Sequence, residues 1–269
     1  SNATTTQMLN PHRRNWAVDM LQKIGIPTHI FPQVVDPATT LGEYEGIPVI
    51  TPATHDTGSA VAAVPTRTKN FAYISSGTWS LVGLELQLPI INDAVFEANL
   101  TNEGGVENTF RLLKNVMGLW IIQQCRATWA AAGHNYSYAE LVELAESASP
   151  LQFVVDVDDP RFLTPGDHPQ HIQDWCTENG QPVPQTLAEM VRCVLESLAL
   201  KYRSVLHDLQ TISGQQVDVI HIVGGGTQNT LLNQLTADAT GIPVVTGPIE
   251  ATVFGNAVMQ LIALGELST

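Results

Sequence analysis

The chain of 269 residues carries 26 Asp and Glu against 12 Lys and Arg, a formal charge of −14 at neutral pH. This acidity argues against a nucleic-acid partner and against adsorption on an anionic membrane, because both depend on basic side chains. Hydrophobic residues make up 44% of the chain, enough for a large core, and the length fits one or two domains.

No apolar run approaches the roughly 18 residues of a membrane-spanning helix. The polar first ten residues lack the pattern of a signal peptide, and Ser1-Asn2-Ala3 has the form of a scar left by tag removal. Three widely spaced cysteines do not make a disulfide framework, so we expect a cytoplasmic protein. We expect Cys125 to be buried, and the sequence leaves open whether Cys176 and Cys193 are bridged.

The opening third of the chain contains short, proline-interrupted elements. Residues 15–21 predict an amphipathic helix, 46–50 a short buried strand, and 56–64 a helix of small residues that ends at Pro65. The polar, basic segment that follows indicates a domain boundary, which we place between residues 66 and 67.

From that boundary onward, strand patterns alternate with helix patterns, which predicts an α/β sheet. The expected strands are 71–75, 79–84, 109–115, 153–157, 217–223 and 243–246, and the expected helices are 117–132, 138–147, 187–209, 231–239 and 254–264. Residues 158–174 contain three prolines and are expected to form a loop-rich insertion.

Gly224-Gly225-Gly226 ends an apolar strand and precedes a helix. Glycines there let a ligand approach the backbone, and the free N–H groups of the helix start suit phosphate. The dinucleotide fingerprint fails because Asn229 stands where its third glycine is needed, and the sequence contains no Walker A motif. Taken alone, the pattern does not separate a nucleotide site from an ordinary glycine-rich turn.

Two further turns contain polar groups suited to a ligand. Residues 75–80 place hydroxyls and amides between two strands, where they could surround a phosphate or simply form a hairpin. Asp56 follows a strand and begins a helix, so it could accept a proton in phosphoryl transfer or serve as an N-cap. The three turns together fit ATP-dependent transfer to a hydroxyl group.

With these residues in view, the chain resembles the FGGY family of carbohydrate kinases, within the actin-like ATPase superfamily. The matching stretches are His55-Asp56-Thr57 with Ser59-Ala60-Val61, residues 75–81, 101–105 and 114–120, and Gly224-Gly225-Gly226 with Gln228-Asn229. The resemblance covers nearly the whole chain, and residues 101–105 and 114–120 point to the branch that acts on L-rhamnulose. It implies an actin-like (ribonuclease H-like) fold with a mixed sheet flanked by helices.

The resemblance also implies roles for individual residues. Asp56 matches the family's proton acceptor, and His55, Thr57 and Asn115 match positions that contact the sugar. Positions that match nucleotide contacts, or that would line the nucleotide pocket beside them, are Thr78, Gln123, Gly225, Gly77, Gly224, Gly226 and Asn229. Magnesium would arrive with ATP, and no residue of the chain is expected to be a metal ligand.

One departure from the family concerns its opening phosphate loop, which has no counterpart here. We therefore expect residues 1–3 to be the scar, 4–66 to be the end of a truncated sugar-binding domain, and 67–269 to be the nucleotide-binding domain. Such a fragment is expected to be weakly active or inactive alone. Its partners would be a small sugar and ATP, with no nucleic acid or membrane, in a monomer or weak homo-oligomer.

Two alternatives remain open at this stage. The substrate could be another ketose or polyol, such as fuculose, xylulose or glycerol, or the chain could be a non-catalytic actin-like module that binds nucleotide. A metal site at His168 and His171 is also conceivable, but Pro169 lies between them and no third histidine or cysteine is near in sequence. A solvated loop is the favoured interpretation of that segment.

Overall fold

The computed structural model describes residues 1–268. The chain divides into two compact units. Unit 1 contains Ser1–Arg67, Gly83–Lys114 and the C-terminal segment from Glu250, and unit 2 contains Thr68–Val82 and Asn115–Ile249. Within the described residues, no helix is long and apolar enough to cross a membrane.

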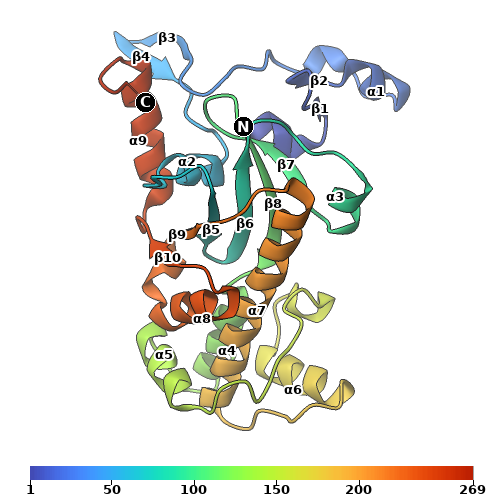
Figure 1. The fold of residues 1–269 in the computed structure, drawn as a ribbon, viewed down its shortest axis with the longest axis vertical. Coiled ribbons are helices and arrows are strands. Elements are labelled where there is room, and N and C mark those ends of the chain that lie inside the picture. Colours follow the sequence, from blue (N-terminus) through green and yellow to red (C-terminus); the bar gives the residue numbers. More distant parts are fainter. Residues whose placement is uncertain (269) are drawn as a thin grey trace. The chain divides into compact units, whose positions relative to one another are not determined.

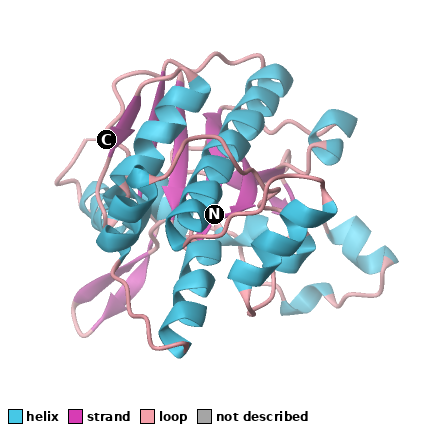
Figure 2. Ribbon diagram, turned by 90° about the horizontal axis from the view of Figure 1, so that it is seen from below, coloured by secondary structure: helices cyan, strands magenta, loops and turns pink. Residues whose placement is uncertain are grey.

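A six-stranded mixed sheet has the strand order β10-β9-β5-β6-β8-β7, and Figure 2 shows its strands flanked by helices. The strands are β5 (Phe71–Ser76), β6 (Trp79–Leu86), β7 (Thr101–Gly104), β8 (Phe110–Met117), β9 (Val219–Val223) and β10 (Val244–Thr246). Pairing is parallel for β5 with β9 and for β9 with β10, and antiparallel for β7 with β8. The predicted α/β class with a mixed sheet is confirmed.

Strands β5 and β9, in the parallel part of the sheet, are almost wholly buried, whereas β10 at its edge is largely exposed. Phe71 to Ile74 in β5 and Ile220 to Val223 in β9 are almost all inaccessible to solvent, as expected for strands covered on both faces. The register aligns Ser75 with Val223. The turns that follow the two strands therefore emerge side by side, which brings two of the predicted ligand turns together.

The helices of unit 2 belong to the segments between and after these strands (Figure 1). They are α4 (Trp120–Ala131), α5 (Tyr138–Ser147), α6 (His168–Glu178), α7 (Leu187–Ser213) and α8 (Thr230–Thr240). The long helix α7 begins with a capping box between Thr186 and Glu189 and ends at Gly214, whose φ of 72° is left-handed. Its apolar stripe is buried against α4, α5 and α8.

Unit 1 is built from shorter pieces. They comprise the 3-10 helices Asn2–Thr6 and Thr28–Ile30, the strand pairs β1 (Leu9–Asn10) with β2 (Asn15–Trp16) and β3 (Thr40–Tyr44) with β4 (Ile47–Ile50), and the helices α1 (Val18–Lys23), α2 (Asp56–Ala62), α3 (Asp93–Glu97) and α9 (Ala251–Ala263). Helix α9 packs along α2, so the end of the chain supports an element from its first quarter.

The structure corrects four predicted elements. Residues 153–157 do not form a strand, because their N–H groups bond to side chains instead, such as Val155 to Ser197 Oγ at 2.9 Å. Residues 15 and 16 belong to a strand, so the first helix begins only at Val18. The β4 strand is exposed rather than buried, since it pairs only with β3. The fourth helix begins at Trp120 because β8 extends to Met117.

The segment 158–174 is also more ordered than predicted. Pro160–Phe162 forms a 3-10 helix, and α6 begins at His168 with Asp167 as its N-cap and Pro169 in its first turn. The expected solvated histidine loop is wrong. His168 is fully buried, and its two ring nitrogens lie 3.2 Å from the carbonyl oxygens of Gly166 and Phe162.

The three cysteines are buried free thiols. The prediction for Cys125 is therefore confirmed, and burial raises the pKa of its thiol. Cys176 and Cys193 are not bridged. Their thiols hydrogen-bond to each other, and this contact together with burial raises the pKa of Cys193.

Candidate functional site

The glycine turn after β9 contains three glycines in three different surroundings. Gly224 has a φ of 88°, and a Cβ there would lie 2.8 Å from the carbonyl oxygen of Ser76. A Cβ on Gly226 would lie 1.9 Å from Ser76 Oγ, whereas a Cβ on Gly225 would meet nothing within 4 Å. The outer two glycines thus allow the turn to pack on the end of β5, and the middle one leaves open space for a ligand.

The turn after β5 is tied to the start of α4. The N–H groups of Leu119 and Trp120 donate to the carbonyl oxygens of Gly77 and Thr78, both at 3.1 Å. Thr78 Oγ1 in turn lies 3.3 Å from Gln123 Oε1 and can donate to it. This brings Thr78 and Gln123, two of the predicted nucleotide residues, into direct contact.

A buried pair of hydroxyls supports the same turn. Ser80 Oγ lies 2.7 Å from the hydroxyl of Tyr202, a fully buried residue of α7. Burial raises the pKa of Tyr202 to about 12, so the phenol stays neutral at physiological pH. Gly118 completes the contact, because a Cβ there would lie 2.7 Å from Ser80 Oγ.

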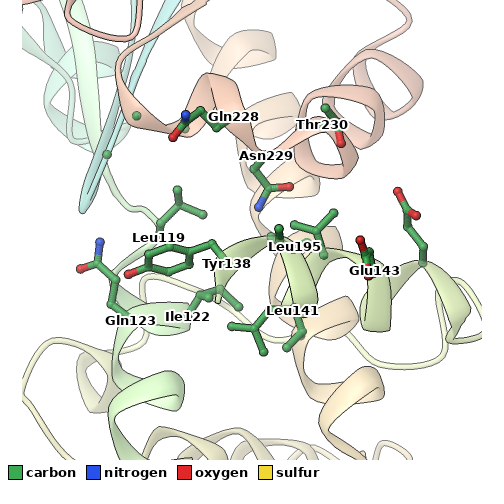
Figure 3. A pocket seen from close by; sticks show the side chains of 17 residues that line it. Leu119, Ile122, Gln123, Tyr138, Leu141, Glu143, Leu195, Gln228, Asn229 and Thr230 are labelled. Carbon is green, nitrogen blue, oxygen red and sulfur yellow. The ribbon is translucent and has the colours of Figure 1, made fainter. Parts of the chain in front are cut away.

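The two turns border a pocket of about 640 Å³ that lies wholly within unit 2. In Figure 3, Gln228 and Asn229 of the glycine turn face the side chains of α4, α5 and α7. The lining residues are Gly77, Leu119, Ile122, Gln123, Tyr138, Ala139, Leu141, Val142, Glu143, Glu146, Val191, Leu195, Gly225, Gly226, Gln228, Asn229 and Thr230. Apolar walls with a few polar groups are typical of a small-molecule site.

Helix α5 supplies one wall of this pocket. Its N-terminus is fixed by a capping box between Ser137 and Glu140, which places Tyr138 at the first turn. The ring of Tyr138 is half exposed. The guanidinium of Arg126 lies over one face of this ring, 4.8 Å from its centroid. Glu143 lies further along the same wall. An aromatic face and a carboxylate are groups that can contact the base and ribose of a nucleotide.

Asp56 begins the short helix α2 in unit 1, and its side chain is 76% exposed. Residues 57–61 of the helix are buried, and α2 packs against α9. A Cβ on Gly255 of α9 would lie 1.7 Å from the carbonyl oxygen of Ser59, and Thr252 Oγ1 donates to the Asp56 carbonyl oxygen at 3.2 Å. A buried helix thus presents one exposed carboxylate, which fits a proton acceptor.

A line of charged side chains leads from Asp56 into the protein. His55 Nε2 lies 3.3 Å from Asp56 Oδ1, and His55 Nδ1 lies 2.9 Å from Glu103 Oε2. Arg111 Nη2 donates to the same Glu103 oxygen at 2.9 Å. Burial raises the pKa of Glu103, but its hydrogen bond with His55 and the charge of Arg111 outweigh burial and leave that pKa below its usual range.

The remaining predicted site residues can be placed as follows. Thr57 is buried, and its N–H donates to Asp56 Oδ1 at 2.6 Å. Asn115 is an exposed residue of β8. Asn229 lines the pocket and is also the N-cap of α8, with its Oδ1 accepting the N–H of Leu232 at 2.9 Å.

Sequence reasoning missed three residues of these sites. Tyr138 is positioned by a capping box that the pattern Ser-Tyr-Ala-Glu could have indicated. Glu103 stood inside a matched motif but received no role. Arg111 gave no signal, since an arginine in an apolar strand becomes informative only when its partner across the fold is known.

The sequence profile of the C-terminal domain of the FGGY family of carbohydrate kinases matches residues 72–264. A protein from Bacteroides thetaiotaomicron named rhamnulokinase is 44% identical over 274 residues, covering 98% of this chain and 56% of its own length. One of the same name from Enterococcus faecalis is 43% identical over 279 residues, covering 99% of this chain and 56% of its own length.

The chain belongs to the FGGY family of carbohydrate kinases. Within this FGGY chain, the matched region contains both turns of the unit 2 pocket. The chain spans a little over half the length of the curated relatives it matches.

Solved structures of sugar kinases share the fold of this FGGY chain. Xylulose kinase from Lactobacillus acidophilus superimposes with a TM-score of 0.72 at 15% identity, over 97% of this chain and 54% of its own. Glycerol kinase from Plasmodium falciparum, solved with ADP, superimposes with a TM-score of 0.70 at 14% identity. The match covers 97% of this chain and 53% of the glycerol kinase chain. The predicted actin-like fold is therefore confirmed.

Proposed function

We propose that the protein carrying this chain transfers the γ-phosphoryl group of ATP to L-rhamnulose, giving L-rhamnulose 1-phosphate and ADP. The similarity to proteins named rhamnulokinase, at 43–44% identity across nearly the whole chain, is the observation that carries this proposal. The glycine-turn pocket and the exposed Asp56 carboxylate supply the two kinds of site that such a reaction needs.

In this proposal Asp56 is the general base. Its carboxylate takes the proton of the sugar's primary hydroxyl as that oxygen bonds to the γ-phosphorus, and the bond from the γ-phosphorus to the bridging oxygen of ADP breaks. His55, Thr57 and Asn115 contact the sugar. Little covalent chemistry is left for the protein, so positioning and electrostatics supply most of the acceleration.

The unit 2 pocket is proposed to hold the nucleotide. Gly77, Thr78 and Gln123 would meet its phosphates, and Gly225 with Asn229 would border the nucleoside. Gly224 and Gly226 hold the turn against β5. Among residues 1–268, no cluster of three His, Cys, Asp or Glu is placed to hold a metal ion. Magnesium would enter as part of the ATP substrate, neutralising the β and γ phosphates.

Three finer points belong to the same proposal. Residues 4–66 would be part of the sugar-binding domain and 67–269 the nucleotide-binding domain. The protein would act as a monomer or weak homo-oligomer. A cytoplasmic location would give it access to ATP.

The test is ADP release by the protein that carries this chain, with L-rhamnulose, L-fuculose, xylulose and glycerol as substrates. We expect turnover on L-rhamnulose, and a fall of about 10² to 10⁴ in kcat for Asp56→Asn with ATP binding retained. Asp19→Asn is the matched control, because the Asp19 side chain is 83% exposed and its ion pair is with Arg13, which belongs to neither site.

Each outcome of this assay has a distinct meaning. Turnover only on another sugar would keep the chemistry and discard L-rhamnulose as the substrate. Undiminished turnover in Asp56→Asn would remove the general-base role. Absence of turnover on every sugar, with nucleotide still bound, would favour a non-catalytic nucleotide-binding module.

A further inference from the structure

The side chains between Arg111 and Asp56 form a series that runs from the interior to the surface. Their exposed fractions are 0% for Arg111, 7% for Glu103, 25% for His55 and 76% for Asp56. Formal charges alternate along this series when the imidazole is protonated. Each charge then has an opposite charge as its neighbour, which is the condition for stable burial of the inner pair.

The distances show how the ring of His55 is held. Nδ1 lies 2.9 Å from Glu103 Oε2 and 3.2 Å from Arg111 Nη2. Nε2 lies 3.3 Å from Asp56 Oδ1. Glu103 and Arg111 on one side of the ring therefore fix the nitrogen that faces Asp56 on the other side.

We propose that Glu103, held in place by Arg111, is a positioning residue that keeps the His55 ring aimed at Asp56. This inference rests on the proposed function, in which Asp56 is the base. The ring would restrain the one exposed carboxylate of the site. Glu103 and Arg111 would act through His55, without touching the sugar.

A buried hydrogen bond and strand pairing hold Glu103 and Arg111 together. Glu103 lies in β7 and Arg111 in the neighbouring β8, where they are directly paired across the antiparallel strands. Such cross-strand pairs of opposite charge fix each other's direction. The sheet residues Glu103 and Arg111 therefore fix the position of His55. Asp56 is restrained both by α2, in which it lies, and through His55 by the sheet.

Other charged groups also face this series. Glu85 of β6 interacts with the charge of Arg111, and burial raises the pKa of Glu85. The amino group of Ser1 lies near Arg111, Glu103 and Asp36, and burial lowers the pKa of that amino group. Since these groups surround Arg111 and Glu103, a test has to change the carboxylate that contacts His55 and compare it with an equal change elsewhere.

The test compares Glu103→Gln with Glu107→Gln in the protein that carries this chain. Glu107 is an exposed residue only four positions away, so the control removes the same charge without touching His55. With Glu103→Gln we expect kcat to fall at least about tenfold and KM for ATP to stay unchanged. The pH profile of kcat/KM should also differ from that of Glu107→Gln, because a charge beside His55 and Asp56 has been removed.

Glu103→Gln could instead act by weakening the fold, so a second variant is needed. His55→Gln keeps a hydrogen-bonding side chain but cannot titrate, and His55 is only partly buried. We expect its pH profile of kcat/KM to change in the same limb as that of Glu103→Gln, because both variants alter the side chains that lead to Asp56. An unmoved pH profile in both variants would overturn the proposal, whatever the change in melting temperature.

Failure of this inference can be told apart from failure of the proposed function. If Asp56→Asn abolishes turnover while Glu103→Gln behaves like Glu107→Gln, only the positioning role is lost. If Asp56→Asn retains turnover, the general-base role itself is wrong.

Discussion

Gly224, Gly225 and Gly226 follow one another in the chain but tolerate different changes. Gly226→Ala places a Cβ 1.9 Å from Ser76 Oγ and 3.2 Å from the Ser76 carbonyl oxygen. We expect this overpacking to lower the free energy of unfolding by about 1–3 kcal/mol. Gly225→Ala meets nothing within 4 Å and lies in the pocket lining, so stability should persist while nucleotide affinity falls.

Calorimetric titration with ADP and thermal melting separate the two glycine variants. Gly225→Ala should lose about tenfold in affinity, since its methyl group occupies space that the ligand needs, with a melting temperature near that of the wild type. Gly226→Ala should melt lower. Equal affinities for ADP in Gly225→Ala and the wild type would place the nucleotide away from this turn.

At the residue scale, the sequence revealed those groups whose role depends on local pattern. The glycine turn and Asp56 were found because each follows a strand and starts a helix. Glu103 and Arg111 could not be linked to Asp56, because their contacts join positions about 50 residues apart in the chain. Such contacts arise from strand pairing, which a periodicity pattern does not specify.

At the element scale, the packing of α9 on α2 sets where Asp56 lies. A helix with glycine in its interior is normally less stable than the same helix with alanine there, by about 1 kcal/mol. In Gly255→Ala we expect the opposite, a lower melting temperature and a lower kcat, because the new Cβ would lie 1.7 Å from the Ser59 carbonyl oxygen. Gln260→Ala, an exposed change on the same helix, should be neutral or slightly stabilising. A more stable Gly255→Ala would contradict the close packing of the two helices.

The burial of Tyr202 between α7 and β6 should make stability depend on alkaline pH. Burial raises the pKa of Tyr202 from about 10 to about 12, so the stability gained by keeping the phenol neutral is complete below pH 10 and is lost as pH rises toward 12. The difference corresponds to about 3 kcal/mol.

Thermal melting between pH 9 and pH 12 checks the Tyr202 prediction. At pH 9, Tyr202→Phe should have a lower melting temperature than the wild type, because Ser80 loses its hydrogen-bond partner. As pH rises, the melting temperature of the variant should fall less steeply than that of the wild type. Tyr44→Phe is the control, since Tyr44 is 69% exposed. Parallel curves for Tyr202→Phe and the wild type would show that another group causes the alkaline loss.

Elements were predictable where periodicity agreed with burial. Helix α5 was predicted over its full length, and β5 and α8 within one residue at each end. Residues 153–157 mimic a strand because Phe153, Val155 and Val157 alternate and are buried, yet they pair with no strand. Alternating hydrophobicity indicates which side chains face the core. Whether the segment also forms backbone hydrogen bonds with a neighbouring strand depends on its tertiary context. Helix α6 was missed because its proline lies in the first turn, where proline is tolerated.

At the scale of the whole molecule, the charge of −14 opposes a nucleotide that is itself negative. Two of the acidic residues, Glu143 and Glu146, line the unit 2 pocket. Within the described residues, the lining contains no Lys or Arg. Attraction by backbone N–H groups and helix termini must therefore act against the field of the protein.

This opposition predicts an unusual response to salt. With magnesium removed by chelation, the affinity for ATP should rise as ionic strength increases from about 10 mM to about 150 mM, because the screening length shortens from about 30 Å to about 8 Å. With magnesium present, the dependence should be weaker and the affinity at low salt higher, since the ligand carries less charge. Adenosine, which is uncharged, is the control and should bind equally at both ionic strengths. Calorimetric titration measures all three cases. An ATP affinity that falls with added salt would mean that a positive local potential at the phosphate turn outweighs the net charge of the molecule.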